Sequence, residues 1–248
     1  MNISKYIDYT LLEPTTTERD IVELCQKAEQ NNFYSVCVNS AFVPLARKLL
    51  EKGDVKVCTV IGFPFGAMST KSKVFEAEQA VIDGADEIDM VMGIGFLKSR
   101  NYNTVLQDIS QVKSTIGTTP LKVILEISEL NKNEIIRACE ICLDAKVDFI
   151  KTSTGFSKSG ATLTAVKIIK KTVRDGLKIK ASGGIGDYET ALKYIDAGAD
   201  RIGTSSTIKS ATNAHQARNA RLFKKYIETA ENSKLETKDV LKNQTANR

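Results

Sequence analysis

The chain has 248 residues, a net charge of +5 at pH 7, and 42% apolar against 26% charged residues. This composition is typical of an ordinary soluble globular protein, and the length fits either two small domains or one large α/β unit. No uninterrupted apolar run approaches the ~18 residues of a membrane span. The basic residues form no recognition helix and no stripe with interleaved aromatics, so neither a membrane nor a nucleic acid is expected as a partner.

Eight short runs rich in β-branched and apolar residues alternate with helical patterns along the chain. Most are nearly continuous apolar stretches, as expected for parallel strands that are covered on both faces. The predicted strands are 6–12, 34–38, 55–63, 87–92, 121–127, 147–152, 177–182 and 201–205.

The segments between these runs have helical periodicity and recognisable ends. Residues 15–32 begin with Thr15 and Glu18 at capping-box spacing, which predicts the start of a helix. A second helix follows the third run, and Gly84 is placed to end it. Its predicted apolar face consists of Val74, Ala77 and Val81.

A weak internal repeat supports a cyclic plan. "GADEI" (84–88), "KVDFI" (146–150) and "GADRI" (198–202) each join a helix end to a strand start. Eight strands with helical crossovers predict a (β/α)₈ barrel, that is, an α/β TIM barrel. A doubly wound open sheet is the alternative, but it usually carries GxGxxG after its first strand, and none is present. We expect one catalytic barrel domain over 1–230 and a polar tail over 231–248, mobile or forming a short surface helix.

Cysteine and histidine usage narrows the chemistry. The early Asp8 and the lack of an apolar segment around it argue against a secretory signal, and the cysteines lie mostly inside apolar runs, so a cytoplasmic protein is expected. His215 is the only histidine, which excludes a histidine-based triad and a multi-histidine metal site. We expect neither a metal nor a cofactor. The five cysteines are Cys25, Cys37, Cys58, Cys139 and Cys142.

Three polar residues interrupt or close the apolar runs where a barrel would place its active site. Asp89 interrupts "EIDMVM", Lys151 closes "VDFIK", and Lys180 lies in "IKASGG". Two lysines and an aspartate in one confined mouth suggest amine catalysis, because a lysine attacks a carbonyl only as the free amine. One lysine would be the nucleophile, the second its electrostatic activator, and Asp89 a proton shuttle.

The energy required is within reach of such a site. Bringing a lysine pKa from ~10.4 to ~7 requires roughly 4.6 kcal/mol of preference for the neutral form. A second ammonium ~5 Å away contributes on the order of 3 kcal/mol at an effective dielectric of ~20. Partial desolvation can supply the remainder. The more buried context of Lys151 favours it as nucleophile without settling the choice, and a surface lysine whose ammonium reaches water remains the alternative for either residue.

Two glycine-rich and serine-rich segments predict a phosphate site. "SGGIG" (182–186) follows the seventh run and "GTSS" (203–206) the eighth, where barrel enzymes commonly hold phosphate. Gly183 and Gly184 permit close backbone approach, and Ser205 and Ser206 offer hydroxyl and amide donors.

Four further residues are candidates around this mouth. Asp8 and Thr10 would help to order the site or would only form hydrogen bonds at the barrel rim. Cys37 is included among the candidate substrate contacts, although packing is the simpler interpretation of a cysteine in an apolar run. Glu126 would be either a partner for one of the lysines or part of a structural ion pair.

Several motifs in this order and spacing closely resemble the deoxyribose-phosphate aldolase family over residues 3–208. They are "VCTVIGFPFG", "EIDMVMGIG", "FIKTSTGFS", "IKASGGI" and "RIGTSS". The resemblance implies a class I, metal-free (β/α)₈ aldolase. It would reversibly cleave 2-deoxy-D-ribose 5-phosphate to D-glyceraldehyde 3-phosphate and acetaldehyde, in deoxyribonucleoside catabolism. A Schiff-base aldolase for another phosphosugar and a non-catalytic phosphosugar-binding protein are the alternatives.

The resemblance also assigns roles by motif. It implies that Lys151 forms the Schiff base, that Lys180 promotes the neutral form of that amine, and that Asp89 relays protons. Many members of the family are dimers, so a homodimer is one oligomeric state to expect beside the small phosphosugar substrate. The phosphate pocket of the family corresponds to Gly155, Gly183, Gly184, Gly203, Ser205 and Ser206.

The chain departs from the family pattern at a few positions. "DYTLLEP", with Tyr9 and Glu13, stands where "DHTLLKP" is usual, and Gly93 replaces a common asparagine. Gly186 stands where many relatives carry arginine, and Thr207 where a glycine is usual. The last two changes flank the predicted phosphate site, so the strength of 5-phosphate binding is the part of the resemblance they put in question.

Overall fold

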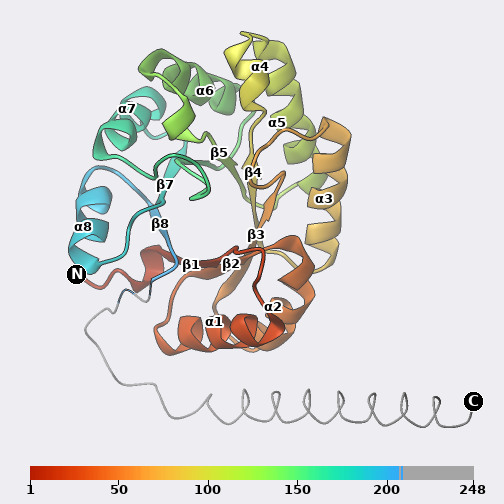
Figure 1. The fold of residues 1–248 in the computed structure, drawn as a ribbon, viewed down its shortest axis with the longest axis vertical. Coiled ribbons are helices and arrows are strands. Elements are labelled where there is room, and N and C mark those ends of the chain that lie inside the picture. The colour runs from red at the N-terminus through yellow and green to blue at the C-terminus, as the bar shows by residue number, and fades with distance from the viewer. Residues whose placement is uncertain (207, 209–248) are drawn as a thin grey trace, which may run out of the picture. The chain divides into compact units, whose positions relative to one another are not determined.

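The fold is a closed barrel of eight parallel strands in chain order, seen in a computed structural model that describes residues 1–206 and 208 (Figure 1). β1 pairs with both β2 and β8, with Ile7 opposite Ile202, so no strand edge is left open. All eight predicted strands are present, and the predicted (β/α)₈ architecture is confirmed. The strands are β1 Ile7–Leu11, β2 Ser35–Val38, β3 Lys56–Ile61, β4 Glu87–Val91, β5 Leu121–Ile124, β6 Phe149–Lys151, β7 Lys178–Ser182 and β8 Arg201–Thr204.

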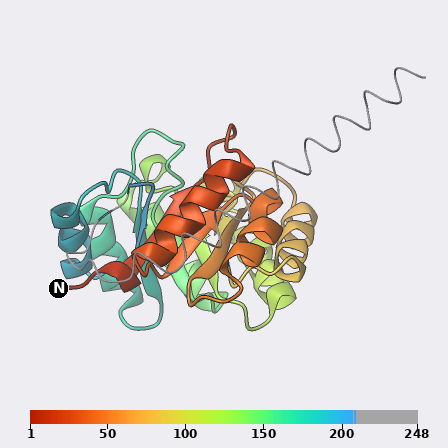
Figure 2. The same cartoon turned by 90° about the horizontal axis from the view of Figure 1, so that it is seen from below.

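Helices cover the outside of the barrel between successive strands (Figures 1 and 2). They are α1 Glu18–Gln30, α2 Val43–Leu50, α3 Thr70–Ile82, α4 Ile94–Lys98, α5 Tyr102–Ile116, α6 Lys132–Asp144, α7 Leu163–Val173 and α8 Tyr188–Asp196, with short 3₁₀ turns η1 Ser4–Tyr6, η2 Ser40–Phe42 and η3 Ile127–Glu129. No helix among the described residues is long and apolar enough to cross a membrane. The expected domain end at 230, the expected tail over 231–248, His215 and Thr207 lie outside the described residues.

The strands are buried on both faces, and the two faces differ in chemistry. In β4, Ile88 and Met90 alternate with Glu87 and Asp89, and all four are buried. Side chains two residues apart on a strand share a face, so the apolar set faces the helices while the charged set faces the barrel interior. At β4 the barrel interior is therefore lined by charges.

Helix α1 begins two residues later than its capping pattern predicts. Thr17 is the N-cap: its side chain accepts from the Asp20 N–H, and the Asp20 carboxylate accepts from the Thr17 N–H at 2.8 Å. The predicted pair, Thr15 and Glu18, was wrong. Threonine three residues before an acid occurs twice in this segment, and a preceding turn, in which the Thr16 N–H donates to the Glu13 carbonyl, selects the later pair.

Helix α3 buries a different face from the one predicted. Lys73, Ala77 and Ala80 are its buried residues, whereas Val74 and Val81 are only half-buried. The Lys73 ammonium lies 2.6 Å from the Asp108 carboxylate of α5, and both side chains are almost fully buried. A periodicity analysis treats lysine as a surface residue, so it could not identify a helix face that is held by a buried ion pair.

The recurring aspartate of the internal repeat forms the same contacts each time. Asp86, Asp148 and Asp200 each accept, at 2.8 Å, the N–H of a residue at the start of the preceding odd-numbered strand, which is Val57, Leu121 or Ile179. Each aspartate also donates its own N–H to the carbonyl of that same residue. Each aspartate stands one residue before an even-numbered strand. The repeat therefore connects the starts of neighbouring strands at the amino-terminal end of the barrel.

Removing one of these carboxylates should destabilise the barrel. Asp148→Ala leaves the buried Leu121 N–H without its acceptor, so we expect the free energy of unfolding in urea to fall by about 1 kcal/mol. Asp148→Asn keeps an acceptor oxygen and should lose less. An equal loss in both variants would instead assign the effect to the ion pair with Lys113, whose ammonium lies 2.7 Å from the carboxylate.

Candidate active site

Asp89 is the central carboxylate of the barrel interior. Its Oδ2 accepts from the ammonium groups of both Lys151 and Lys180, each at 2.9 Å, and its Oδ1 lies 2.9 Å from the ammonium of Lys122. All four side chains are buried. The structure thus brings together the three predicted residues. Because Lys151 and Lys180 each lie 2.9 Å from the same oxygen, their side-chain nitrogens are also close to each other.

The remaining charges close a ring through the barrel. The Lys122 ammonium lies 2.6 Å from Glu87 Oε2, and Arg201 donates to Glu87 Oε1 at 2.8 Å. Arg201 also donates to Asp8 Oδ1 at 2.6 Å, and the Lys180 ammonium lies 2.6 Å from Asp8 Oδ2. Acids and bases alternate around this arrangement, which we call the charge ring. Its members, in order, are Asp89, Lys122, Glu87, Arg201, Asp8 and Lys180.

The ring favours the charged forms of Asp8, Asp89 and Lys180. Burial alone would raise the pKa of Asp89, but the neighbouring lysines, Lys122 foremost, hold it well below its ordinary range. Burial alone would lower the pKa of Lys180, and the charges of Asp8 and Asp89 reverse this and raise it. The pKa of Asp8 is lowered to about 2, because the charges of Lys180 and Arg201 outweigh the effect of its burial. Lys180 is accordingly a permanent cation and Asp89 a permanent anion near neutral pH.

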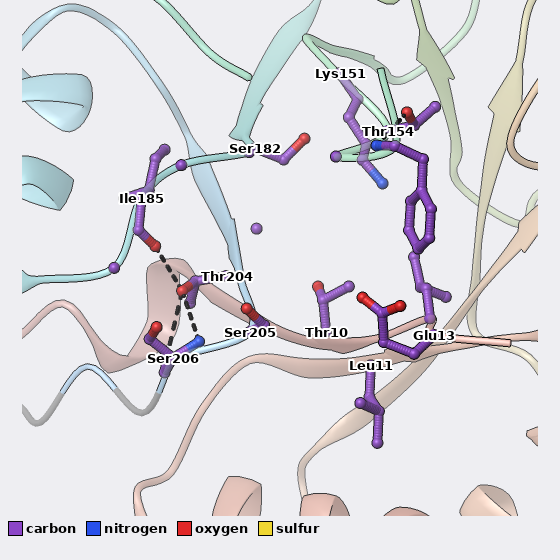
Figure 3. Close-up of a pocket in the computed structure, with 17 residues that line it drawn as sticks. Thr10, Leu11, Glu13, Lys151, Thr154, Ser182, Ile185, Thr204, Ser205 and Ser206 are labelled. Atoms are coloured by element: carbon purple, nitrogen blue, oxygen red, sulfur yellow. Dashed lines mark hydrogen bonds between the residues drawn. The ribbon is translucent and has the colours of Figure 1, made fainter. Parts of the chain in front are cut away.

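A cavity of about 410 Å³ opens above the ring at the carboxyl ends of the strands (Figure 3). Lys151 is the only one of the three predicted catalytic residues that lines it, and its side-chain nitrogen points into the space. Asp89 and Lys180 lie beneath, with no exposed surface. The arrangement offers one amine to a bound molecule and keeps the charged groups that act on it out of reach.

The opposite wall of the cavity is formed by the two predicted phosphate loops. The N–H groups of Gly183, Gly184 and Ser205 have no hydrogen-bond partner among the described residues, so all three remain available to an anion. Gly184 has a φ of 76°, a conformation that a side chain would strain. The Ser206 N–H, in contrast, donates to Thr204 Oγ, which itself donates to the Ile185 carbonyl and so joins the two loops (Figure 3).

The charges on the cavity wall are few. Of its lining residues only Lys151 and Glu13 are ionisable, and the Glu13 carboxylate has no partner among the described residues. Gly186 also lines the cavity. An anion at the two loops would therefore be held by backbone N–H and hydroxyl groups, without a cationic side chain from the lining.

Glu126 orders the loop that follows Lys151. It has no lysine partner within residues 1–206: its Oε2 accepts the Thr154 N–H at 3.1 Å and the Thr154 hydroxyl, and Thr154 Oγ in turn accepts the Phe156 N–H at 3.0 Å. Both alternatives considered for Glu126 from the sequence were wrong. The chain of contacts sets the position of Thr154, Gly155 and Phe156, which all line the cavity.

The other predicted site residues lie at different depths. Thr10, Gly155 and Gly203 line the cavity, and Asp8 lies beneath it in the charge ring. A side-chain carbon at Gly203 would come within 3.1 Å of Lys180 Cε, so the glycine leaves room for that lysine. Cys37 is wholly buried in a cluster with Leu12, Cys58 and Val60 and is not part of the cavity lining. Its role as a substrate contact stays a prediction.

Sequence reasoning missed three members of the ring: Glu87, Lys122 and Arg201. A usable signal was present, because Glu87 stands two residues before Asp89 and therefore shares its inward face. Lys122 and Arg201 likewise lie in otherwise apolar strands where a charge is costly unless it is paired.

Residues 3–206 match the model of the "DeoC/LacD family aldolase". The chain belongs to this family. The deoxyribose-phosphate aldolase of Mannheimia succiniciproducens is 50% identical over 206 residues, which cover 83% of this chain and 92% of that protein.

Solved aldolase structures are similar over nearly the whole described barrel. One described as "QR15, an Aldolase" superimposes with a TM-score of 0.80 at 43% identity, covering 91% of this chain and 97% of that one. The deoxyribose phosphate aldolase of Aeropyrum pernix, described as a unique tetramer, has a TM-score of 0.76 at 32% identity and covers 84% and 88% of the two chains.

The Glu126–Thr154 contact in this aldolase can be tested by substitution. Thr154→Val removes a hydroxyl that donates to a buried carboxylate and accepts an N–H, so the free energy of unfolding should fall by about 1–3 kcal/mol. Thr154→Ser retains the hydroxyl and is the matched control. A Val variant as stable as the Ser variant would show that the contact does not stabilise the loop.

Proposed function

We propose that this chain is a class I aldolase that reversibly cleaves 2-deoxy-D-ribose 5-phosphate to D-glyceraldehyde 3-phosphate and acetaldehyde. The observation that carries the proposal is the position of the Lys151 amine, which enters the cavity from a floor of fixed charges and faces loops with free N–H donors. The name of the relative that is 50% identical supports the choice of substrate.

Lys151 performs the covalent step. Its free amine adds to the C1 aldehyde of the open-chain sugar phosphate, and loss of water from the carbinolamine gives an iminium ion. The iminium accepts the electron pair of the C2–C3 bond as that bond breaks, while the C3 hydroxyl gives up its proton and leaves as the aldehyde of glyceraldehyde 3-phosphate. The remaining enamine is protonated at C2, and hydrolysis releases acetaldehyde and the amine. No metal or cofactor is needed, because the iminium itself is the electron sink.

The buried charges support these steps without touching the sugar carbons. Lys180, held protonated by Asp8 and Asp89, disfavours a second cation beside it and so favours the free amine of Lys151. Asp89 accepts a hydrogen bond from the same amine and orients it. Since its pKa is held low, any proton that Asp89 accepts during dehydration is passed on at once, which is the behaviour of a relay.

The setting that we propose is cytoplasmic deoxyribonucleoside catabolism. All five cysteines are buried and none forms a disulfide, which supports a reducing compartment. A homodimer is one oligomeric state that we propose, and sedimentation of the full chain tests it.

Trapping of the Schiff base tests the covalent step. Incubation with substrate and borohydride should add a two-carbon fragment to Lys151, detected by peptide mass spectrometry. Lys151→Met should give neither the adduct nor turnover. Lys180→Met keeps the nucleophile but removes the neighbouring charge, so it should form adduct at neutral pH far more slowly. Turnover by wild type with Lys151 unmodified after borohydride would refute the mechanism, and turnover lost in EDTA would oppose a metal-free enzyme.

The phosphate loops raise a second candidate, a Schiff-base aldolase for another phosphosugar, because no cationic side chain lines them. If they hold the 5-phosphate through free N–H groups and the Ser206 hydroxyl, 2-deoxy-D-ribose should be cleaved with kcat/KM lower on the order of 100-fold. Ser206→Ala should weaken binding of the phosphorylated substrate alone. The difference in kcat/KM between the phosphorylated and unphosphorylated sugars should therefore become smaller. Equal rates with and without the phosphate, or a faster reaction with a different phosphosugar, would favour the second candidate.

A further inference from the structure

The charge ring is electrically balanced, and Lys151 is attached to it as an extra group. Three carboxylates alternate with three basic groups around the ring, and every member contacts two members of opposite sign. Lys151 meets only one ring member, Asp89. Its protonation would therefore add one uncompensated positive charge beside a buried, balanced ring.

The position of the ring makes this balance effective. Lys151 is 2% exposed, and the members nearest to it, Asp89, Lys122 and Lys180, are 0% exposed. At an effective dielectric of ~20, one unit charge a few ångströms away is a large effect. A charge removed anywhere in the ring therefore changes the electrostatic potential at the Lys151 amine.

We propose that Lys122, Glu87 and Arg201 are positioning residues of the aldolase, which keep Lys151 a free amine by completing a ring with no net charge. The inference rests on the proposed Schiff-base function and extends the activating role from Lys180 alone to the whole ring. None of the three lines the cavity, so they act only through Asp89, Asp8 and Lys180.

Other ionisable groups approach this region without entering the balance. The thiols of Cys37 and Cys58 face it from β2 and β3. Cys58 donates to Asp89 Oδ1 at 3.2 Å and lies 3.5 Å from the Lys122 ammonium, and burial raises its pKa, whereas a hydrogen bond with Cys58 lowers the pKa of Cys37. Glu126 is engaged by Thr154, and Glu13 lies on the open cavity wall. Tyr34, just before β2, stacks against Arg201, whose guanidinium carbon lies 3.1 Å from the aromatic ring centroid, and burial raises the pKa of the Tyr34 hydroxyl. The remaining groups are the ring members: Asp8 on β1, Glu87 and Asp89 on β4, Lys122 on β5, Lys180 on β7 and Arg201 on β8.

The signs of the expected effects follow from the count. Lys122→Met leaves one carboxylate in excess, so a protonated Lys151 restores neutrality and the free amine appears only at higher pH. Glu87→Gln leaves one cation in excess and favours the free amine further. The double variant Glu87→Gln/Lys122→Met removes one charge of each sign and restores the balance.

Acetylacetone gives the measurement, because it forms an absorbing enaminone with a free lysine amine. The rate of enaminone formation at Lys151, assigned by peptide mass spectrometry, is recorded against pH for the full chain. For Lys122→Met the midpoint should move up by ~1 pH unit or more, and for Glu87→Gln it should move down. The double variant should return close to wild type. The readout needs no sugar phosphate, so failure of the chain to cleave deoxyribose 5-phosphate would refute the proposed function and leave this test valid.

A buried ion pair outside the barrel provides the matched control. Lys73→Met removes an ammonium from its contact with Asp108, so it should lower stability and leave the midpoint in place. If Lys122→Met does not fold, as judged by circular dichroism, the nearly isosteric Glu87→Gln still tests the proposal, because its pH midpoint should move down. An unmoved midpoint in a folded Lys122→Met or Glu87→Gln, or a double variant shifted as far as Lys122→Met, would overturn the proposal.

Discussion

The structure depends on one buried carboxylate, Asp89, that the side-chain nitrogens of three lysines share. Burying a single charge in a protein interior is costly, and burying four in contact is tolerable only when each has partners of opposite sign. Closure of the barrel supplies them: β1 and β8 bring Asp8 and Arg201 together, although the two residues lie 193 positions apart in the chain. An open sheet with the same strands would leave this arrangement incomplete.

This constraint places the charged groups in the barrel interior and the neutral polar groups on the cavity wall. The charges lie below the cavity, where their burial strengthens each electrostatic interaction, and of the charge ring and Lys151 only Lys151 lines the cavity. The rest of the cavity wall offers a ligand mainly backbone N–H groups and hydroxyls. Their positions depend on neutral contacts such as the bridge from Thr204 to the Ile185 carbonyl. Reactivity and recognition are thus set by different kinds of interaction.

The opposite end of the barrel has a purely structural design. Asp86, Asp148 and Asp200 repeat one two-point contact with the start of a neighbouring strand. Such contacts fix the register of the strands, and the register decides which side chains face inward. Contacts at the amino-terminal end of the barrel therefore help to set the geometry of the inward-facing charges above them, although these contacts lie at the end opposite the cavity.

The sequence by itself determined what depends on local pattern. The eight strands, the repeat, the glycine-rich loops and the exceptional Lys151 and Lys180 could all be predicted, because each is encoded in a few adjacent residues. Only the tertiary structure decided the partners of Glu126, the completion of the ring by Lys122 and Arg201, and the buried face of α3. Those outcomes depend on contacts between residues distant in the chain, and on charges whose burial is favourable only once every partner is in place.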